Sequence, residues 1–248
     1  MHFKDQLTVN TSLNPEGVYE VHWQWCSKKQ GIVRLDLSNV QLHASARGME
    51  DVIAELHGIH YVLEHKRFLG DSCGGINLSI KCSLGGTKKA LNGKGNYKSL
   101  GGWCTFLNAR YETADMVVDQ DDSFKHPKAL DNISNIEYKK ELYNRVKDFR
   151  GEWFEVTRHA MERVSERWNL GQNAEEAWRK IMLVFRDEVT LEYELVVPDG
   201  RTERFFFNEL QNVLFACKEE AIVSVVYTQK KDIKYLKKMT VDKIESVI

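Results

Sequence analysis

The spacing of apolar residues changes period a fifth of the way along the chain, and this change constrains the fold more than any other feature. Before it, apolar and polar residues partly alternate in 18–25, 31–37 and, more weakly, 40–46, which is typical of short antiparallel strands. After it, apolar residues recur at helical spacing over 49–66, which predicts an amphipathic helix with one buried face. A further strand is expected at 76–82. These elements predict a small sheet with a helix packed on it.

The second half of the chain has its own helices and strands. The polar segment 120–135, which contains Pro127, is the best candidate for a boundary. We therefore expect an α+β protein of two domains, residues 1–125 and 136–248. The expected helices of the second domain are 136–149, 156–168 and 174–185, the expected strands are 190–197, 201–208 and 221–228, and a basic helix is expected at 232–247.

Composition excludes several classes of protein. The five cysteines form no C-x-x-C pair, so neither a zinc site nor a disulfide framework is indicated, and a reducing cytoplasmic setting is expected. No apolar run approaches the roughly 20 residues that span a bilayer, and the first residues lack the apolar core of a signal peptide. The glycine-rich stretch does not match the phosphate-loop pattern, so we expect no small-molecule cofactor. The chain has no lipidation motif and no amphipathic anchor, so we expect no membrane attachment.

Charge is segregated although the whole chain carries a formal charge of only −1. No acidic residue lies between Ser72 and Tyr111. Nine of the 16 glycines lie between Gly70 and Gly102, so the backbone there is expected to be irregular. A local cluster of bases can attract a polyanion even on a neutral protein. The bases of this segment, which we call the basic segment, are Lys81, Lys88, Lys89, Lys94, Lys98 and Arg110.

Aromatic residues are interleaved with these bases. Tyr97, Trp103 and Tyr111 lie in or at the end of the basic segment. Lysines can contact phosphates while unstacked bases lie on aromatic rings, so the combination favours single-stranded nucleic acid. The alternative is a solvated loop that is basic without binding anything.

The first half resembles the ribonuclease H fold over residues 17–120. Three strands lead into a helix carrying Ala54-Glu55-Leu56 and then into another strand, and Glu55 matches the metal-binding glutamate of that family. The resemblance implies further acids at strand ends, but this chain has Gln24-Trp25-Cys26 and Lys81-Cys82-Ser83 there. Two-metal chemistry needs several carboxylates, so a degenerate, metal-free domain is expected. Asp36, Asp119, Asp121 and Asp122 are the alternative ligands, and Glu55 is otherwise expected on the helix surface.

The second half resembles small bacterial toxin domains of the RelE and barnase type over residues 150–230. Their His-Ala-x-x-Arg-x-x-x-Arg helix matches His159, Ala160, Arg163 and Arg167. His159, Arg163 and Arg167 are four residues apart and share one helix face. Such a stripe can hold phosphates, or it can act in metal-independent RNA cleavage with the histidine as acid or base. Glu162 and Glu166 can neutralise the arginines, and the alternative is a purely structural role.

These patterns predict a non-catalytic RNA-binding protein of low sequence specificity, with single-stranded or messenger RNA as the partner. The alternatives are a metal-independent ribonuclease acting through His159, a protein-interaction factor from a mobile element, and a DNA-binding protein. The oligomeric state stays open. Besides the basic segment with Tyr97 and Trp103, and the stripe of His159, Arg163 and Arg167, the expected contacts include the C-terminal Lys230, Lys231 and Lys234.

Overall fold

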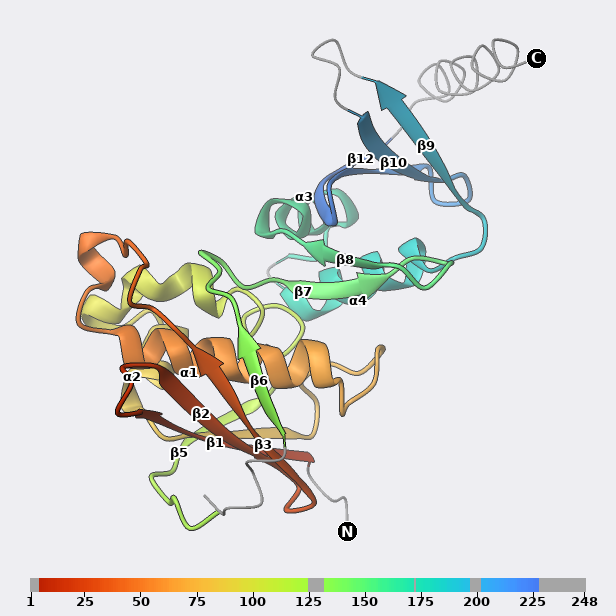
Figure 1. Cartoon of the computed structure of the whole chain (residues 1–248). Coiled ribbons are helices and arrows are strands. Elements are labelled where there is room, and N and C mark those ends of the chain that lie inside the picture. Colours follow the sequence, from red (N-terminus) through yellow and green to blue (C-terminus); the bar gives the residue numbers. More distant parts are fainter. Residues whose placement is uncertain (1–4, 125–131, 172, 197–201, 228–248) are drawn as a thin grey trace. The chain divides into compact units, whose positions relative to one another are not determined.

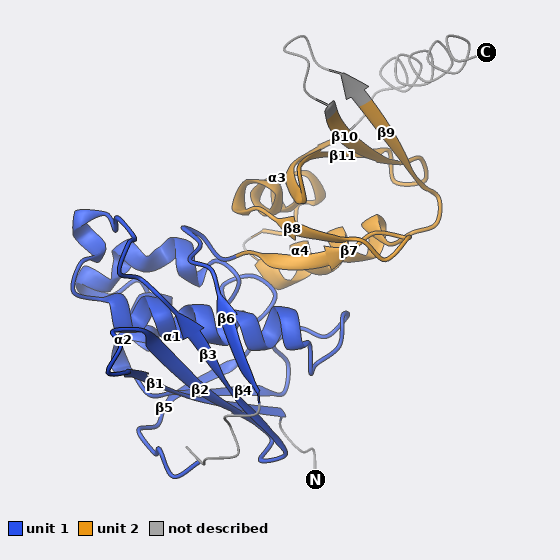
Figure 2. Cartoon of the chain, in the orientation of Figure 1, with its two compact units in different colours: residues 1–142 blue, residues 143–248 orange. Residues whose placement is uncertain are grey.

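The chain forms two compact units, residues 1–142 and 143–248, each built around its own mixed sheet (Figures 1 and 2). The computed structural model describes residues 5–124, 132–171, 173–196 and 202–227. The α+β class is as expected. The predicted helix 232–247 and the predicted contacts Lys230, Lys231 and Lys234 lie outside the described residues. The first unit extends past the predicted boundary because β6 (Ile133–Ile136) pairs with β3 (Lys29–Leu35).

The sheet of unit 1 has the strand order β5-β4-β1-β2-β3-β6. Its first three strands form an antiparallel meander, and β4 and β5 add to it in parallel. Strand β6 pairs in parallel with β3 at the other edge. The remaining bounds are β1 (Asp5–Leu13), β2 (Tyr19–Trp25), β4 (Leu78–Cys82) and β5 (Asp115–Val118).

Helix α1 (Glu50–His60) continues without a break into the π-helix η2 (Tyr61–Lys66), and the two together match the predicted helix 49–66. Helix α1 packs against β1 and β2. In β2 the residues Val21, Trp23 and Trp25 alternate inward and are buried. These side chains, which alternate along the strand, pack with the apolar face of α1 in one core.

The sheet of unit 2 has the order β7-β8-β12-β11-β10-β9, in which only the pair of β8 and β12 is parallel. Phe185 of α4 packs against Phe154, Phe206 and Phe215, with ring centroids 4.7–5.3 Å apart. Its elements are β7 (Asn144–Lys147), β8 (Trp153–Val156), α3 (Arg158–Trp168), α4 (Ala174–Phe185), β9 (Thr190–Val196), β10 (Thr202–Asn208), β11 (Val213–Lys218) and β12 (Ala221–Tyr227).

Two predicted elements were wrong. Residues 40–46 form a loop and the short η1 (Ala44–Ala46) instead of a strand. The predicted helix 136–149 is replaced by the end of β6, an irregular segment and β7. Contacts within unit 1 fix the irregular segment: Trp103 Nε1 donates to the carbonyl of Lys139 at 2.8 Å, and the amide of Leu142 donates to the carbonyl of Gly102 at 3.2 Å. These bonds satisfy backbone groups that a helix would have paired internally.

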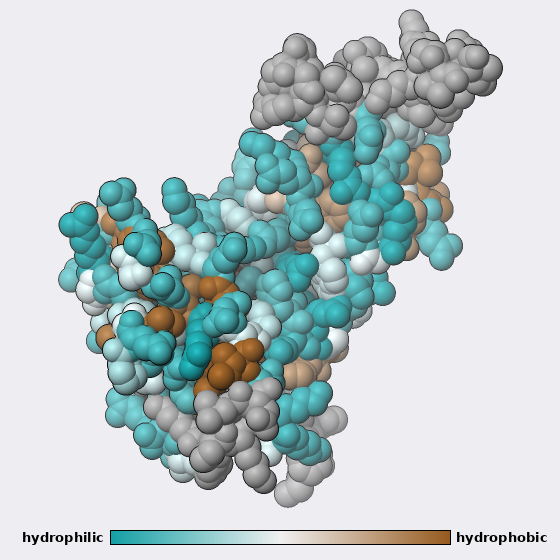
Figure 3. All heavy atoms as spheres, in the orientation of Figure 1, coloured by the Kyte–Doolittle hydropathy of each residue, from teal (hydrophilic) through white to brown (hydrophobic). Residues whose placement is uncertain are grey.

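The basic segment is helical where an irregular backbone was expected. It forms α2 (Gly85–Leu91) and the 3₁₀-helix η3 (Gly95–Cys104). Gly86 lets α2 approach α1 closely, because a Cβ there would lie 2.5 Å from Val52 Cγ2. In the described ranges every helix is too short or too polar to cross a membrane. Hydrophilic side chains cover most of the face seen in Figure 3.

Candidate nucleic-acid-binding pocket

The structure corrects the predicted stacking rings of the basic segment. Trp103 and Tyr111 are 7% and 2% exposed. The Trp103 indole N–H donates to the carbonyl of Lys139, and the Tyr111 hydroxyl donates to the carbonyl of Leu63 at 3.4 Å. Both rings belong to the core of unit 1, so neither offers a face on which a base could stack. Tyr97 is half-buried and keeps part of its surface.

Arg110 is also corrected, because it is a core residue with 1% exposure. Its guanidinium donates to the carbonyls of Cys73 and Gly70 at 2.9 and 2.6 Å and to the carboxylate of Glu64 at 3.5 Å. Glu64 itself has no exposed surface. An arginine enclosed in this way cannot reach a phosphate in solvent.

The lysines of the basic segment divide into held and exposed side chains. Lys81 pairs with Asp119 at 3.0 Å, and the Lys88 ammonium donates to the carbonyl of Met116 at 2.8 Å. Lys89 lies over the Tyr97 ring at 5.6 Å. Lys94 and Lys98 are exposed. The predicted charge field therefore depends mainly on Lys89, Lys94 and Lys98.

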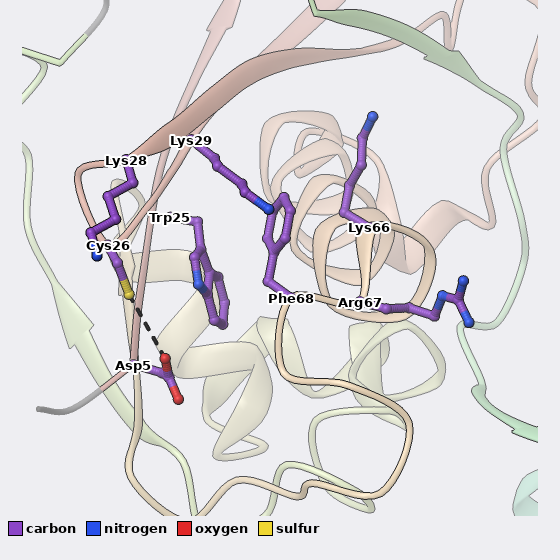
Figure 4. Close-up of a pocket in the computed structure, with 8 residues that line it drawn as sticks. All are labelled: Asp5, Trp25, Cys26, Lys28, Lys29, Lys66, Arg67 and Phe68. Carbon is purple, nitrogen blue, oxygen red and sulfur yellow. Dashed lines mark hydrogen bonds between the residues drawn. The ribbon is translucent and has the colours of Figure 1, made fainter. Parts of the chain in front are cut away.

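A different group of cations surrounds a pocket at the β2–β3 turn of unit 1 (Figure 4). The pocket has a volume of about 460 Å³. Its cations come from two places, the turn itself and the end of η2, and two aromatic rings lie between them. The residues that line it, which we call the cationic pocket, are Asp5, Trp25, Cys26, Lys28, Lys29, Lys66, Arg67 and Phe68.

The cations of the cationic pocket are held to different degrees. Lys29 Nζ lies 4.5 Å from the centre of the Phe68 ring, an arrangement in which the ring attracts the ammonium. Lys66 donates to the side-chain oxygen of Asn132 at 3.2 Å, and Arg67 pairs with Asp71 at 3.2 Å. Lys28 is exposed. The pocket thus combines partly fixed cations with one exposed cation, Lys28.

Backbone conformation at two of the pocket's corners is uncommon. Cys26 and Ser27 both have positive φ, +47° and +56°, and the amide of Lys28 closes the turn onto the carbonyl of Trp25 at 3.0 Å. Arg67 ends η2 with φ +53°. Non-glycine residues in this region are strained, and such strain collects at functional sites. The two turns that these residues form bring Lys28 and Arg67 beside the same cavity.

Sequence reasoning missed the cationic pocket. The available signals were two adjacent pairs of bases, Lys28-Lys29 three residues after Trp25 and Lys66-Arg67 directly before Phe68. The pairs lie far apart in the chain, and only the packing of η2 beside the β2–β3 turn brings them together. Without that contact each pair is indistinguishable from an ordinary solvated turn or helix end.

Glu55 is fully buried, which corrects the expectation of a surface residue. Its carboxylate accepts bonds from the Ser83 amide at 2.9 Å, the Ser83 hydroxyl at 2.6 Å, the Leu84 amide at 3.3 Å and the Thr87 hydroxyl. The pKa of Glu55 is raised, because burial raises it by more than these hydrogen bonds lower it. Within the described ranges, no three His, Cys, Asp or Glu side chains are arranged to hold a metal ion. Protein donors occupy the Glu55 oxygens that a metal would need.

A second cavity, of about 230 Å³, lies beside His57. The Nδ1 of His57 is 2.8 Å from the carbonyl of Ile53, and its Nε2 accepts from the amide of Lys139 at 3.0 Å. These partners require the neutral ring with its proton on Nδ1. Burial lowers the pKa of His57 from 6.5 to about 4.

The stability of unit 1 should fall in acid because of His57. The folded pKa lies below the unfolded one, so the stabilisation is complete above about pH 6.5 and is lost as the pH falls toward 4. The expected loss between pH 7 and pH 5 is about 2 kcal/mol. Urea unfolding at both pH values, followed by hydrogen exchange of α1 peptides, measures it. In His57→Gln the free energy of unfolding should fall by about 2 kcal/mol less between pH 7 and pH 5 than in the parent. The same fall in the variant as in the parent would show that His57 is not its source.

The predicted stripe of unit 2 lies on α3, which begins at the N-cap Thr157. His159 is exposed, and Arg163 and Arg167 are half-buried. Arg163 pairs with Glu166 at 2.9 Å, and its Nε donates to His159 Nε2 at 3.4 Å. The helix therefore brings the stripe together, but Glu166 offsets part of its charge.

Two sets of predicted contacts thus remain at the surface, the lysines of the basic segment and the stripe on α3, and the cationic pocket joins them as a third. Comparison of the chain with protein-family models, with curated proteins and with solved structures finds no match.

Proposed function

We propose that the chain binds single-stranded RNA without cleaving it, and that the cationic pocket of unit 1 is the main contact. One observation carries the proposal: four cations, one carboxylate and the half-buried ring of Phe68 line a single cavity, and the buried Trp25 forms part of its wall. Cations on both sides of the cavity can contact successive phosphates of a strand crossing it. The sequence favoured the same ligand but a different surface.

The single strand follows from the position of the rings. Phe68 is half-buried between Trp25, at 5.4 Å, and the ammonium of Lys29. A base entering the cavity displaces Lys29 from the ring and stacks on Phe68, and the released ammonium then reaches the phosphate. A base paired within a duplex cannot enter in this way.

Binding without cleavage is supported by the two sites where chemistry was considered. The carboxylate of Glu55 is enclosed by protein donors. Arg163 is ion-paired beside His159. We also propose that unit 1 is a degenerate ribonuclease H-like domain and unit 2 a toxin-like domain. The order in unit 1 of three antiparallel strands, a helix and a parallel strand supports the first relation.

A matched pair of double variants tests the proposal. Lys28→Glu/Lys29→Glu alters the cationic pocket, and Lys94→Glu/Lys98→Glu alters the basic segment; all four lysines are exposed in unit 1. The pocket variant should weaken binding to a single-stranded RNA by roughly tenfold or more. The slope of log affinity against log salt should fall by about 1.4, since each lost contact removes about 0.7 on a single strand. Fluorescence anisotropy across a salt series gives both values.

The basic-segment variant is the control and should bind nearly as the parent does. The reverse outcome, in which only Lys94→Glu/Lys98→Glu weakens binding, would return the site to the surface that the sequence predicted. Equal binding by all three proteins would remove unit 1 as the site. Cleavage of labelled RNA in chelator that His159→Ala abolishes would replace the proposal with a metal-independent ribonuclease.

A further inference from the structure

Asp5 is the one acid among the eight residues that line the cationic pocket. It forms no ion pair with any residue that the structure describes, although four cations line the same cavity. From the residues in the described ranges its carboxylate accepts one long contact, from the Cys26 thiol at 3.8 Å to Oδ1, and a thiol is a weak donor. Figure 4 shows this contact, with the Trp25 ring between Asp5 and Phe68 in the view. Both oxygens thus keep the capacity to accept strong bonds.

A carboxylate in this position weakens binding to every phosphate nearby, so its contribution must come from another part of the ligand. Phosphate oxygens offer no N–H donor, whereas base edges do. A carboxylate has two adjacent acceptors and matches best a ligand with two adjacent donors. Guanine presents N1–H and N2–H side by side on its Watson–Crick edge, and that edge is free when the base is unpaired.

We infer that Asp5 makes the cationic pocket selective for guanine in single-stranded RNA. This inference rests on the proposed function and assigns a base to the same cavity. With the base in the cationic pocket, the Asp5 oxygens accept from N1–H and N2–H, while Lys28 and Lys66 contact the phosphates on either side. Uracil offers one donor between two carbonyl oxygens, which the carboxylate repels. Adenine and cytosine each offer one amino group and no adjacent ring N–H.

The experiment compares oligouridylates that differ at one central position, which carries guanine, inosine, adenine, cytosine or uracil. The parent protein should bind the guanine oligonucleotide at least about fivefold more tightly than the all-uracil one, the lower end expected for a bidentate base contact. Inosine lacks the N2 amino group and should fall between them. Quenching of Trp25, which lines the cavity, or fluorescence anisotropy reports the binding.

Asp5→Asn gives the decisive second readout, because its two effects have opposite signs. Loss of the negative charge should strengthen binding to the all-uracil oligonucleotide, while the ratio of guanine to uracil affinity should fall to about one. A merely misfolded variant would weaken binding to every oligonucleotide. Hydrogen exchange of β1 peptides checks that the strand is intact.

The outcomes separate the inference from the proposed function. Equal affinity of the parent protein for all five oligonucleotides would overturn the guanine preference and leave RNA binding standing. A preference that survives in Asp5→Asn would overturn the role of Asp5. If the parent protein binds none of the five oligonucleotides, both the guanine preference and the proposed RNA binding are wrong.

Discussion

Glu55→Ala is expected to destabilise unit 1 by about 3–5 kcal/mol. The carboxylate has no exposed surface and accepts from the Ser83 amide and hydroxyl, the Leu84 amide and the Thr87 hydroxyl. Alanine leaves these donors buried without an acceptor, and each costs about 1–3 kcal/mol when stranded, less what reorientation of the hydroxyls and entry of water recover. The bonds join α1 to the end of β4 and the start of α2, so their loss loosens all three elements.

Hydrogen exchange of the full chain measures this loss with a control in the same molecule. Peptides from α1 should exchange faster in Glu55→Ala, whereas peptides from α4 in unit 2 should keep the parent rate. Glu55→Gln keeps the shape and one acceptor oxygen, so it should cost less than half as much. A destabilisation below about 1 kcal/mol by Glu55→Ala would show that water replaces the carboxylate at little cost.

The long periodic elements could be predicted from the sequence. The helices over 49–66, 156–168 and 174–185 are present, because each carries an apolar stripe at helical spacing that finds a sheet to cover. Strands β9 and β10 are also present where the hairpin was expected. In these elements local pattern and tertiary packing favour the same structure.

Strand β1 could not be predicted in the same way, although it is central in the sheet of unit 1. Only Leu7 and Val9 bring apolar side chains to its core face, and Thr8 and Asn10 are buried on the other face. Two apolar residues alternating with polar ones are too short a pattern to predict a strand from the sequence. The missed β1 also shifted the strands that were compared with the ribonuclease H fold, since the meander begins at Asp5 and not at residue 18.

The candidate site shows the same limit. A count of bases and rings located a segment rich in both, but it could not tell a ring on the surface from a ring in the core. Trp103 and Tyr111 supply apolar area that unit 1 buries, and an aromatic ring contributes more to stability there than on a surface. The cationic pocket arises from contacts between distant segments, as do most sites on loops and element ends.

Arg110→Met should also strongly lower the stability of unit 1, while the RNA affinity of the folded protein should stay unchanged. Arg110 and Glu64 are 1% and 0% exposed and lie 3.5 Å apart. Methionine fills much of the space but leaves the Glu64 carboxylate without its cation and the carbonyls of Cys73 and Gly70 without a donor. Removing one member of a buried ion pair costs about 3–5 kcal/mol.

Two measurements distinguish this role from the phosphate contact that the sequence predicted. At a temperature where Arg110→Met is folded, the salt slope of RNA binding should equal that of the parent, whereas a lost phosphate contact would lower it by about 0.7. The double variant Arg110→Met/Glu64→Gln should recover part of the lost stability, because the buried carboxylate is then neutral. A reduced salt slope with unchanged hydrogen exchange in α1 would place Arg110 at the ligand after all. The two measurements together therefore decide whether Arg110 stabilises the core of unit 1 or contacts the nucleic acid.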